Sequence, residues 1–201
     1  MENEDMVKLL EADFNQCFQQ MRHYDCMMYE VIKFMASAYI ALIGAGIGVY
    51  EFGVTKGQDY TLVVLVTFSI AFLLGLFMYM SLIRNRVYYV HVTRYVNEIR
   101  KLILDKKPLG FENKSKMYTN YQQPPFFNWR SSQAYIMYVS STINSCLFGT
   151  IFYILFCNSV HKWCCAISST SILIILQLTI GIVYLITRNN KSASQSVFGK
   201  E

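Results

Sequence analysis

Four long apolar runs constrain this chain more than any other feature of its sequence. The runs cover residues 34–52, 61–83, 134–156 and 166–187, and each is close to the ~20 residues that a helix needs to cross a bilayer core. The chain has 201 residues, of which 54% are hydrophobic and 15% charged, so its length allows one domain. The sequence therefore predicts an all-α, polytopic membrane protein with four transmembrane helices and cytoplasmic helical extensions.

The distribution of basic residues predicts the topology. Three Lys or Arg residues precede the first run, ten lie in residues 84–133, three lie from residue 188 onward, and each short connection holds one. Sixteen of the eighteen basic residues thus fall on one side, which the positive-inside rule makes cytoplasmic. The N-terminal segment is acidic and too long for a cleaved signal peptide, so we expect it to be retained. Both termini are predicted to be cytoplasmic.

The resulting order of segments has three cytoplasmic parts. It comprises an amphipathic N-terminal helix (1–33), a transmembrane hairpin (34–83), a basic cytoplasmic helix and loop (84–133), a second hairpin (134–187) and a flexible tail (188–201). The first cytoplasmic part sums to −4 and the second to +7. Opposite charges favour packing of these two parts, although basic residues that only set the topology would account for the same numbers.

Apolar spacing gives stronger support for a packed cytoplasmic layer. Before the first run, apolar residues recur at steps of three and four: Val7, Leu10, Phe14, Cys17, Met21, Tyr24, Met28, Val31 and Met35. This spacing is typical of a helical seam and predicts one helix from the N-terminus into the membrane. After the second run the same rhythm recurs at Tyr88, Val92, Tyr95, Ile99 and Leu102. The second span is therefore expected to continue as a basic helix that ends at "LDKKPLG", residues 104–110.

The loop before the third run has no helical period and contains an aromatic cluster. Pro124 and Pro125 are followed by Phe126, Phe127 and Trp129, with Arg130 next. Aromatic residues beside a basic residue at the edge of a span are typical of an interfacial anchor. A specific binding loop is the alternative.

Motifs for catalysis or for cofactor binding are absent from the sequence, which predicts no enzymatic activity and no cofactor. The segment "GAGIG", residues 44–48, lies inside a span without a preceding strand, so it is not interpreted as a nucleotide motif. Gly44 and Gly48 are interpreted as a small-residue face for helix or subunit packing. In the third connection, "CNSVHKWCC" places Cys157, Cys164 and Cys165 near a histidine; a disulfide, unpaired thiols and a metal site are the alternatives, and the spacing matches no standard zinc site.

Polar residues inside the last two runs are the main candidate for function. "SSTINS", residues 140–145, lies near the middle of the third run and Gln177 near the middle of the fourth. Buried amides in hydrocarbon need partners or water. The candidate pore-lining residues are Ser140, Ser141, Asn144 and Gln177. They form either an interhelical hydrogen bond or a polar path, and four spans require several copies to enclose a wide path. We expect a homo-oligomer, with a tetramer favoured.

The chain resembles the small bacterial membrane effectors that accompany nucleotide-second-messenger synthases in antiphage defence. The resemblance covers about residues 15 to 105 and lies in the order of "MRHYDCMMYEVIKF" (21–34), a membrane hairpin and "RNRVYYVHVTRYVNEIRK" (84–101). The overall plan is similar to the four-span effector of the Hailong-type system. The second hairpin departs from the two-span pattern of most of these effectors.

The resemblance implies an ion-conducting or membrane-disrupting effector of the bacterial inner membrane that a cytoplasmic signal controls. A nucleotide or short oligonucleotide would then bind the basic helix, with tyrosines available for base stacking. The candidate ligand-binding residues are Arg84, Arg86, Arg94, Arg100 and Lys101. The alternative function is a non-conducting membrane anchor or scaffold whose cytoplasmic helices recruit a soluble defence protein.

Overall fold

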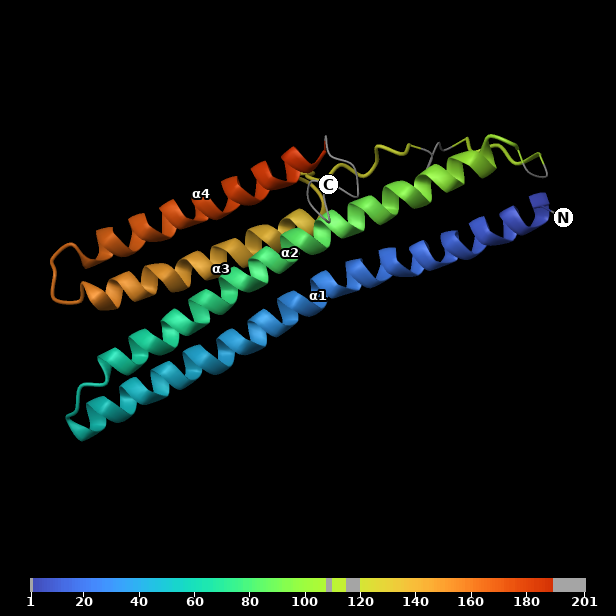
Figure 1. Cartoon of the computed structure of the whole chain (residues 1–201). Helices are drawn as coiled ribbons and strands as arrows, with labels where there is room; N and C mark the ends of the chain where they lie inside the picture. Colours follow the sequence, from blue (N-terminus) through green and yellow to red (C-terminus); the bar gives the residue numbers. More distant parts are fainter. Residues whose placement is uncertain (1, 108–109, 115–119, 190–201) are drawn as a thin grey trace, which may run out of the picture. The chain divides into compact units, whose positions relative to one another are not determined.

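The computed structural model describes residues 2–107, 110–114 and 120–189, with side chains from residue 5 onward. The fold is all-α and consists of α1 (Glu2–Lys56), α2 (Thr61–Leu104), α3 (Ser132–Leu155) and α4 (Lys162–Arg188), shown in Figure 1. All four helices are long and apolar enough to cross a membrane. The predicted all-α, four-span fold is confirmed, and the chain is an integral membrane protein. Residues 190–201 of the predicted tail lie outside the described residues.

Local hydrogen bonds and glycine set the ends of the helices. Gly57 takes φ of +67°, a left-handed conformation that suits glycine after the last turn of α1. The backbone N–H of Thr61 donates to Asp59 Oδ1 over 2.9 Å, which begins α2. Ser131 caps α3, because its side chain accepts a hydrogen bond from the Ala134 N–H over 3.1 Å. α2 ends at Leu104, inside the predicted terminating segment.

α1 and α2 are single helices of 55 and 44 residues, as the apolar spacing predicted. The chain divides into two compact units, to each of which both helices contribute. We call residues 1–28, 84–128 and 185–201 the loop unit, and residues 29–83 and 129–184 the bundle unit.

The bundle unit contains the apolar stretches of all four helices. Its main apolar cluster is built from α1, α2 and α3 and comprises Met35, Tyr39, Val64, Phe68, Ala71, Leu147 and Ile151. Gly46 of α1 lies against the ring of Phe68, so α1 and α2 approach closely at this point. Gly149 of α3 lies against the backbone oxygen of Ala166 and the side chain of Thr170 on α4. Small residues thus allow close helix packing in this unit.

The loop unit joins the first part of α1 to the last part of α2. The rings of Tyr24 and Tyr88 stack with their centroids 5.5 Å apart, and the hydroxyl of Tyr95 donates to Asp13. Tyr24, Tyr88 and Tyr95 belong to the predicted apolar seams. These contacts show that the two seams meet in the middle of the unit.

The predicted seams are wrong at their outer ends. Val7 is 65% exposed and Leu102 is 53% exposed, whereas Ile99 is buried. Apolar spacing does not show how far along a helix another helix packs against it. The predicted seams therefore extend beyond the packed region.

Candidate functional site

A polar core lies inside the bundle unit. Ser140, Ser141, Asn144 and Ser145 of α3 are fully buried, and Gln177 of α4 is 5% exposed. The four α3 residues form two adjacent pairs, 140–141 and 144–145, that are four positions apart, so they share one face of that helix. Within the described part of the bundle unit, no buried residue carries a charge.

Tyr39 anchors the polar core to α1. Its hydroxyl donates a hydrogen bond to Asn144 Oδ1 over 2.7 Å. Gly75 of α2 makes room for this pair, because a Cβ atom on Gly75 would meet both Tyr39 Oη and Asn144 Oδ1. One turn earlier on α1, the sulfur of Met35 lies 3.3 Å from Ser140 Oγ. Three helices therefore meet at the tyrosine–amide pair.

Tyr79 makes the corresponding contact to α4. Its hydroxyl donates to the backbone oxygen of Gln177 over 2.9 Å, and Gly181 leaves the space that the Tyr79 hydroxyl needs. Tyr79 lies one turn after Gly75 on α2. The two tyrosine contacts are therefore successive levels of one polar core.

The pairing of α3 and α4 brings Gln177 to the level of Ser141. A Cβ atom on Gly181 would lie 3.4 Å from the side chain of Met137. One turn back along α4 is Gln177, and one turn forward along α3 is Ser141. Because the two helices form an antiparallel hairpin, Gln177 and Ser141 fall at the same level along it.

Several polar atoms of this core have no hydrogen-bond partner in the structure. They are Asn144 Nδ2, Ser141 Oγ, Ser145 Oγ, and both Nε2 and Oε1 of Gln177. An unpartnered polar group in an apolar environment costs free energy, of the order of 1–3 kcal/mol by mutational measurements. The polar core is consequently suited to binding water or an ion.

A second polar arrangement occupies the loop unit, on the face of α2 opposite the seam. Arg86 Nε donates to the Phe126 oxygen over 2.9 Å and Arg86 Nη2 to the Pro125 oxygen over 2.6 Å. Arg94 Nε donates to the Pro124 oxygen over 3.2 Å. We call residues 123–126 the strap, since these donors hold its carbonyl groups along the helix.

Asn97 completes the attachment of the strap by donating from Nδ2 to the Gln123 oxygen over 2.9 Å. Pro124 and Pro125 have no N–H to donate, so the strap presents carbonyl oxygens to a helix face that presents donors. The arrangement assigns the guanidinium groups of Arg86 and Arg94 to holding the loop.

Phe126 fastens the strap through its ring. The residue is 1% exposed, its ring centroid lies 5.0 Å from that of His91 in an edge-on arrangement, and the Arg94 guanidinium lies 4.6 Å from the ring centroid. The expectation that Phe126 is an interfacial anchor is wrong, because the residue packs inside the loop unit. Trp129, by contrast, is 65% exposed.

The environment of the strap changes the pKa values of the groups that hold it. Burial lowers the pKa of the Arg86 guanidinium to about 10 and lowers the pKa of Arg94. Burial, followed by the positive charges of Arg94 and Arg188, lowers the pKa of His91. Burial disfavours the charged form of each group. This face of α2 therefore favours neutral His91.

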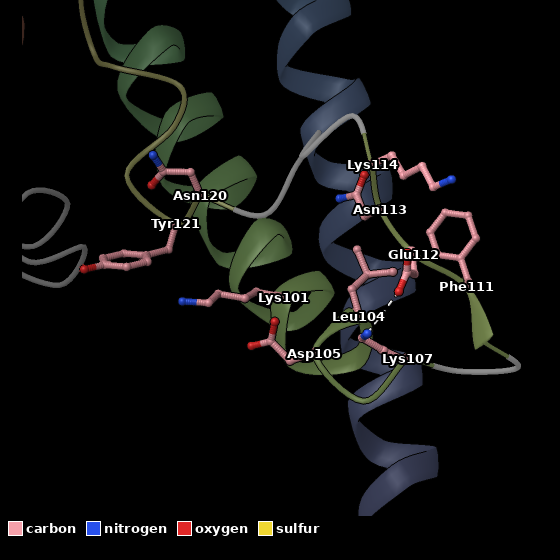
Figure 2. A pocket seen from close by; sticks show the side chains of 10 residues that line it. All are labelled: Lys101, Leu104, Asp105, Lys107, Phe111, Glu112, Asn113, Lys114, Asn120 and Tyr121. Carbon is pink, nitrogen blue, oxygen red and sulfur yellow. Dashed lines mark hydrogen bonds and ion pairs between the residues drawn. The ribbon is translucent and has the colours of Figure 1, made fainter.

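A cavity of about 560 Å³ lies at the end of α2, in the loop unit. Figure 2 shows Lys101 extending toward Tyr121, and the Lys101 ammonium lies 5.9 Å from the centroid of that ring. Lys107 forms an ion pair with Glu112 over 3.0 Å, and Lys114 also lines the cavity. The volume is within the ~300–1,000 Å³ that is usual for small-molecule sites.

The five predicted ligand-binding residues do not converge on one site. Arg86 and Arg94 hold the strap, and only Lys101 lines the cavity. Arg84 is exposed and donates to the Tyr88 hydroxyl over 3.3 Å. Arg100 lies over the rings of Phe14 and Phe18, 5.6 and 5.5 Å from their centroids.

The glycine and cysteine predictions have separate outcomes. Gly44 and Gly48 both face open space, with no atom within 4 Å of a Cβ built on either residue. They make no close contact within this chain, and Gly46 packs against α2 instead. Cys157, Cys164 and Cys165 are free thiols. Among the described residues, no group of three or more His, Cys, Asp or Glu side chains is placed to hold a metal ion.

No protein-family model, curated protein or solved structure matches this chain.

Proposed function

We propose that the chain is an ion-conducting membrane protein whose conduction path follows the polar core of the bundle unit. The observation that supports this function is the set of buried, unpartnered atoms on Ser141, Asn144, Ser145 and Gln177. Such groups lie in a unit whose helices are otherwise apolar. Polar residues in a membrane interior usually face a cavity or a pathway, where water or an ion supplies the missing partners.

The observed arrangement corresponds to a closed state in this proposal. Ser141, Asn144 and Ser145 are fully buried, so a continuous path requires the helices to separate. Several copies would supply the additional walls, and a tetramer is the assembly that we favour. Gly44 and Gly48 offer open helix surface for close approach of another copy.

The controlling signal in this proposal binds the loop unit from the cytoplasm. The cavity is lined by three lysines, at positions 101, 107 and 114, and by the carboxylates of Asp105 and Glu112, so its lining has a formal charge of +1. This balance favours an anionic ligand, and the ring of Tyr121 is available for stacking. A nucleotide or short oligonucleotide has this chemistry. Together with the resemblance in helix order, this supports a role as an antiphage-defence effector of the bacterial inner membrane, with both termini cytoplasmic.

Ion flux from vesicles tests the conduction path. Purified wild-type protein, reconstituted in vesicles, should release trapped ions when a panel of nucleotides and oligonucleotides is screened. Asn144→Leu should abolish the flux because it removes the central amide. Thr142→Leu is the matched control, since Thr142 lies on the exposed side of the same helix and its replacement should leave the flux unchanged. Equal flux from wild type and Asn144→Leu would exclude Asn144 from the path.

A non-conducting anchor is the second candidate, and the Tyr39–Asn144 hydrogen bond favours it. That bond spans two helices, and interhelical hydrogen bonds of this kind contribute about 0.6–2 kcal/mol to helix association. In this reading the polar core joins the helices, and the loop unit recruits a soluble protein. Absence of flux under every condition, together with recovery of a stoichiometric partner on the loop unit, would support the anchor.

A further inference from the structure

We propose that the polar core binds a small monovalent anion, such as chloride. The proposal deepens the proposed conduction path by naming the class of ion, and in that respect it rests on the proposed function. As a binding site, however, the core can be tested without any measurement of flux.

Asn144 supplies the first group of donors. Its Oδ1 already accepts the hydrogen bond from Tyr39, so the acceptor of this amide is engaged. Its Nδ2 has no partner and carries two N–H groups. The tyrosine therefore fixes the amide with its oxygen toward the Tyr39 hydroxyl and leaves both N–H groups unpartnered.

Ser141 and Ser145 supply hydroxyl donors. Ser141 Oγ and Ser145 Oγ have no hydrogen-bond partner. A serine inside a helix commonly donates to the carbonyl one turn earlier, as Ser171 does to Ile167 over 2.9 Å. Because Ser141 and Ser145 make no such bond, their O–H groups remain available to a ligand.

Gln177, at the level of Ser141, supplies the third group of donors. Its backbone oxygen accepts the Tyr79 hydroxyl, and its side-chain Nε2 has no partner. The polar core thus has six available donors. The amides of Asn144 and Gln177 supply four N–H groups, and the two serines supply two O–H groups. The side-chain oxygen of Gln177 is the one unpartnered atom that can only accept.

The balance of donors distinguishes an anion from a cation. A cation requires oxygen ligands, whereas the four amide N–H groups of the core can only donate and the buried residues described for the bundle unit include no carboxylate. A chloride ion accepts hydrogen bonds from amide N–H and hydroxyl groups. Because the site has no cationic side chain to offset the burial of charge, a single negative charge is favoured over a multivalent anion.

Chloride binding can be measured directly from the line width of the ³⁵Cl nuclear magnetic resonance signal in the presence of the purified full-length protein. Wild-type protein should give excess broadening that saturates with chloride and is displaced by bromide. Gln177→Glu keeps the size of the side chain but replaces an N–H₂ donor group by an oxygen. This variant should bind chloride at least about tenfold more weakly, as expected for the loss of a hydrogen bond to a charged group.

Two further variants protect the test against a folding defect. Ser145→Ala removes one hydroxyl donor with little change in volume and should also weaken chloride binding. Thr142→Val alters an exposed residue of the same helix and should bind chloride as the wild type does. Absence of saturable broadening in the wild type, or equal binding by wild type, Gln177→Glu and Ser145→Ala, would overturn the proposal.

Flux measurements separate this inference from the proposed function. Flux carried by sodium or potassium, in a protein that gives no saturable chloride broadening, would overturn the anion site and leave ion conduction standing. Saturable chloride binding without flux in any solution would support the anion site and overturn conduction.

Discussion

Tyr39 of α1 donates a hydrogen bond to Asn144 of α3 directly beside Gly75 of α2, over 2.7 Å between Oη and Oδ1. The pair is buried in the bundle unit. Three helices therefore depend on one another at this level: the hydroxyl orients the amide, and the absence of a side chain on Gly75 allows both groups to approach. The unpartnered N–H groups of Asn144 follow from this arrangement, because the amide turns its oxygen, and not Nδ2, to Tyr39.

Tyr39→Phe should lower the stability of the bundle unit. The substitution keeps the ring but leaves Asn144 Oδ1 without its donor, which should cost about 1–2 kcal/mol. For a chain of this size, that corresponds to roughly 2–4 °C in the unfolding midpoint for each kcal/mol. Thermal unfolding in detergent measures the effect. Tyr50→Phe is the control, because Tyr50 is 55% exposed, and equal midpoints for both variants would contradict the structural role of the bond.

Gly75→Ala should be more disruptive than its size suggests. The added methyl group would meet the hydroxyl of Tyr39 and the amide oxygen of Asn144, so one of them must move, at a cost of about 1–3 kcal/mol for overpacking. Ser171→Thr provides the comparison, since it also adds one methyl group but at an exposed position of α4. We expect the midpoint of Gly75→Ala to fall and that of Ser171→Thr to stay within about 1 °C of the wild type, because exposed changes have small effects. A similar fall in both variants would indicate a general intolerance of added methyl groups in these helices.

The sequence predicted the polar core but not its connection to the tyrosines. Asn144 and Gln177 were recognised because amides are rare inside apolar runs. Tyr39 was not, because tyrosine is amphipathic and its presence in a span does not reveal whether its hydroxyl faces the interior. The combination of a tyrosine in one span with an amide in another was the available signal. Predicting that Tyr39 and Asn144 pair requires knowing that α1 and α3 lie side by side, and the spacing of residues within each run does not give this.

The strap was missed for a different reason. Arg86 and Arg94 lie outside the apolar seam of α2, so they were interpreted as available for an anionic ligand. The structure covers that face with residues 123–126. Pro124 and Pro125 were the sequence signal, since a pair of residues without N–H groups offers carbonyl oxygens that require donors from elsewhere. Contacts between a helix and a loop that lacks a period cannot be located from periodicity.

Arg86→Met should release the strap. The substitution removes the donors to the Pro125 and Phe126 oxygens while keeping an unbranched side chain, and hydrogen bonds from a charged group contribute about 1.5–3 kcal/mol. Hydrogen–deuterium exchange should therefore become at least about tenfold faster at the backbone amides of residues 120–128. Arg84→Met is the matched control, because Arg84 lies two residues before Arg86 and is exposed. Unchanged exchange in Arg86→Met would show that the ring of Phe126 holds the strap without the guanidinium.

Acidification should loosen the strap through His91. Burial and the charges of Arg94 and Arg188 lower the pKa of His91 below its ordinary value of 6.5, and the ring packs edge-on against Phe126. Below pH 6.5 the unfolded chain then binds more protons than the folded chain, so the stability of the loop unit falls as the pH decreases from 6.5 toward the lowered pKa. Above pH 6.5 both states have neutral His91, and its titration makes no difference to stability.

The pH dependence is measured by hydrogen exchange of residues 120–128, or by limited proteolysis of the same segment, between pH 7.5 and 5. Exchange rates are corrected for the intrinsic effect of pH with an unstructured peptide. Protonated His91 would place a third positive charge beside Arg94 and Arg188, so the strap should become less protected as the pH falls. His91→Gln should remove this dependence because glutamine does not titrate, whereas His23→Gln, at an exposed position of α1, should retain it. Identical profiles for wild type and His91→Gln would mean that another group controls the response of the loop unit to acid.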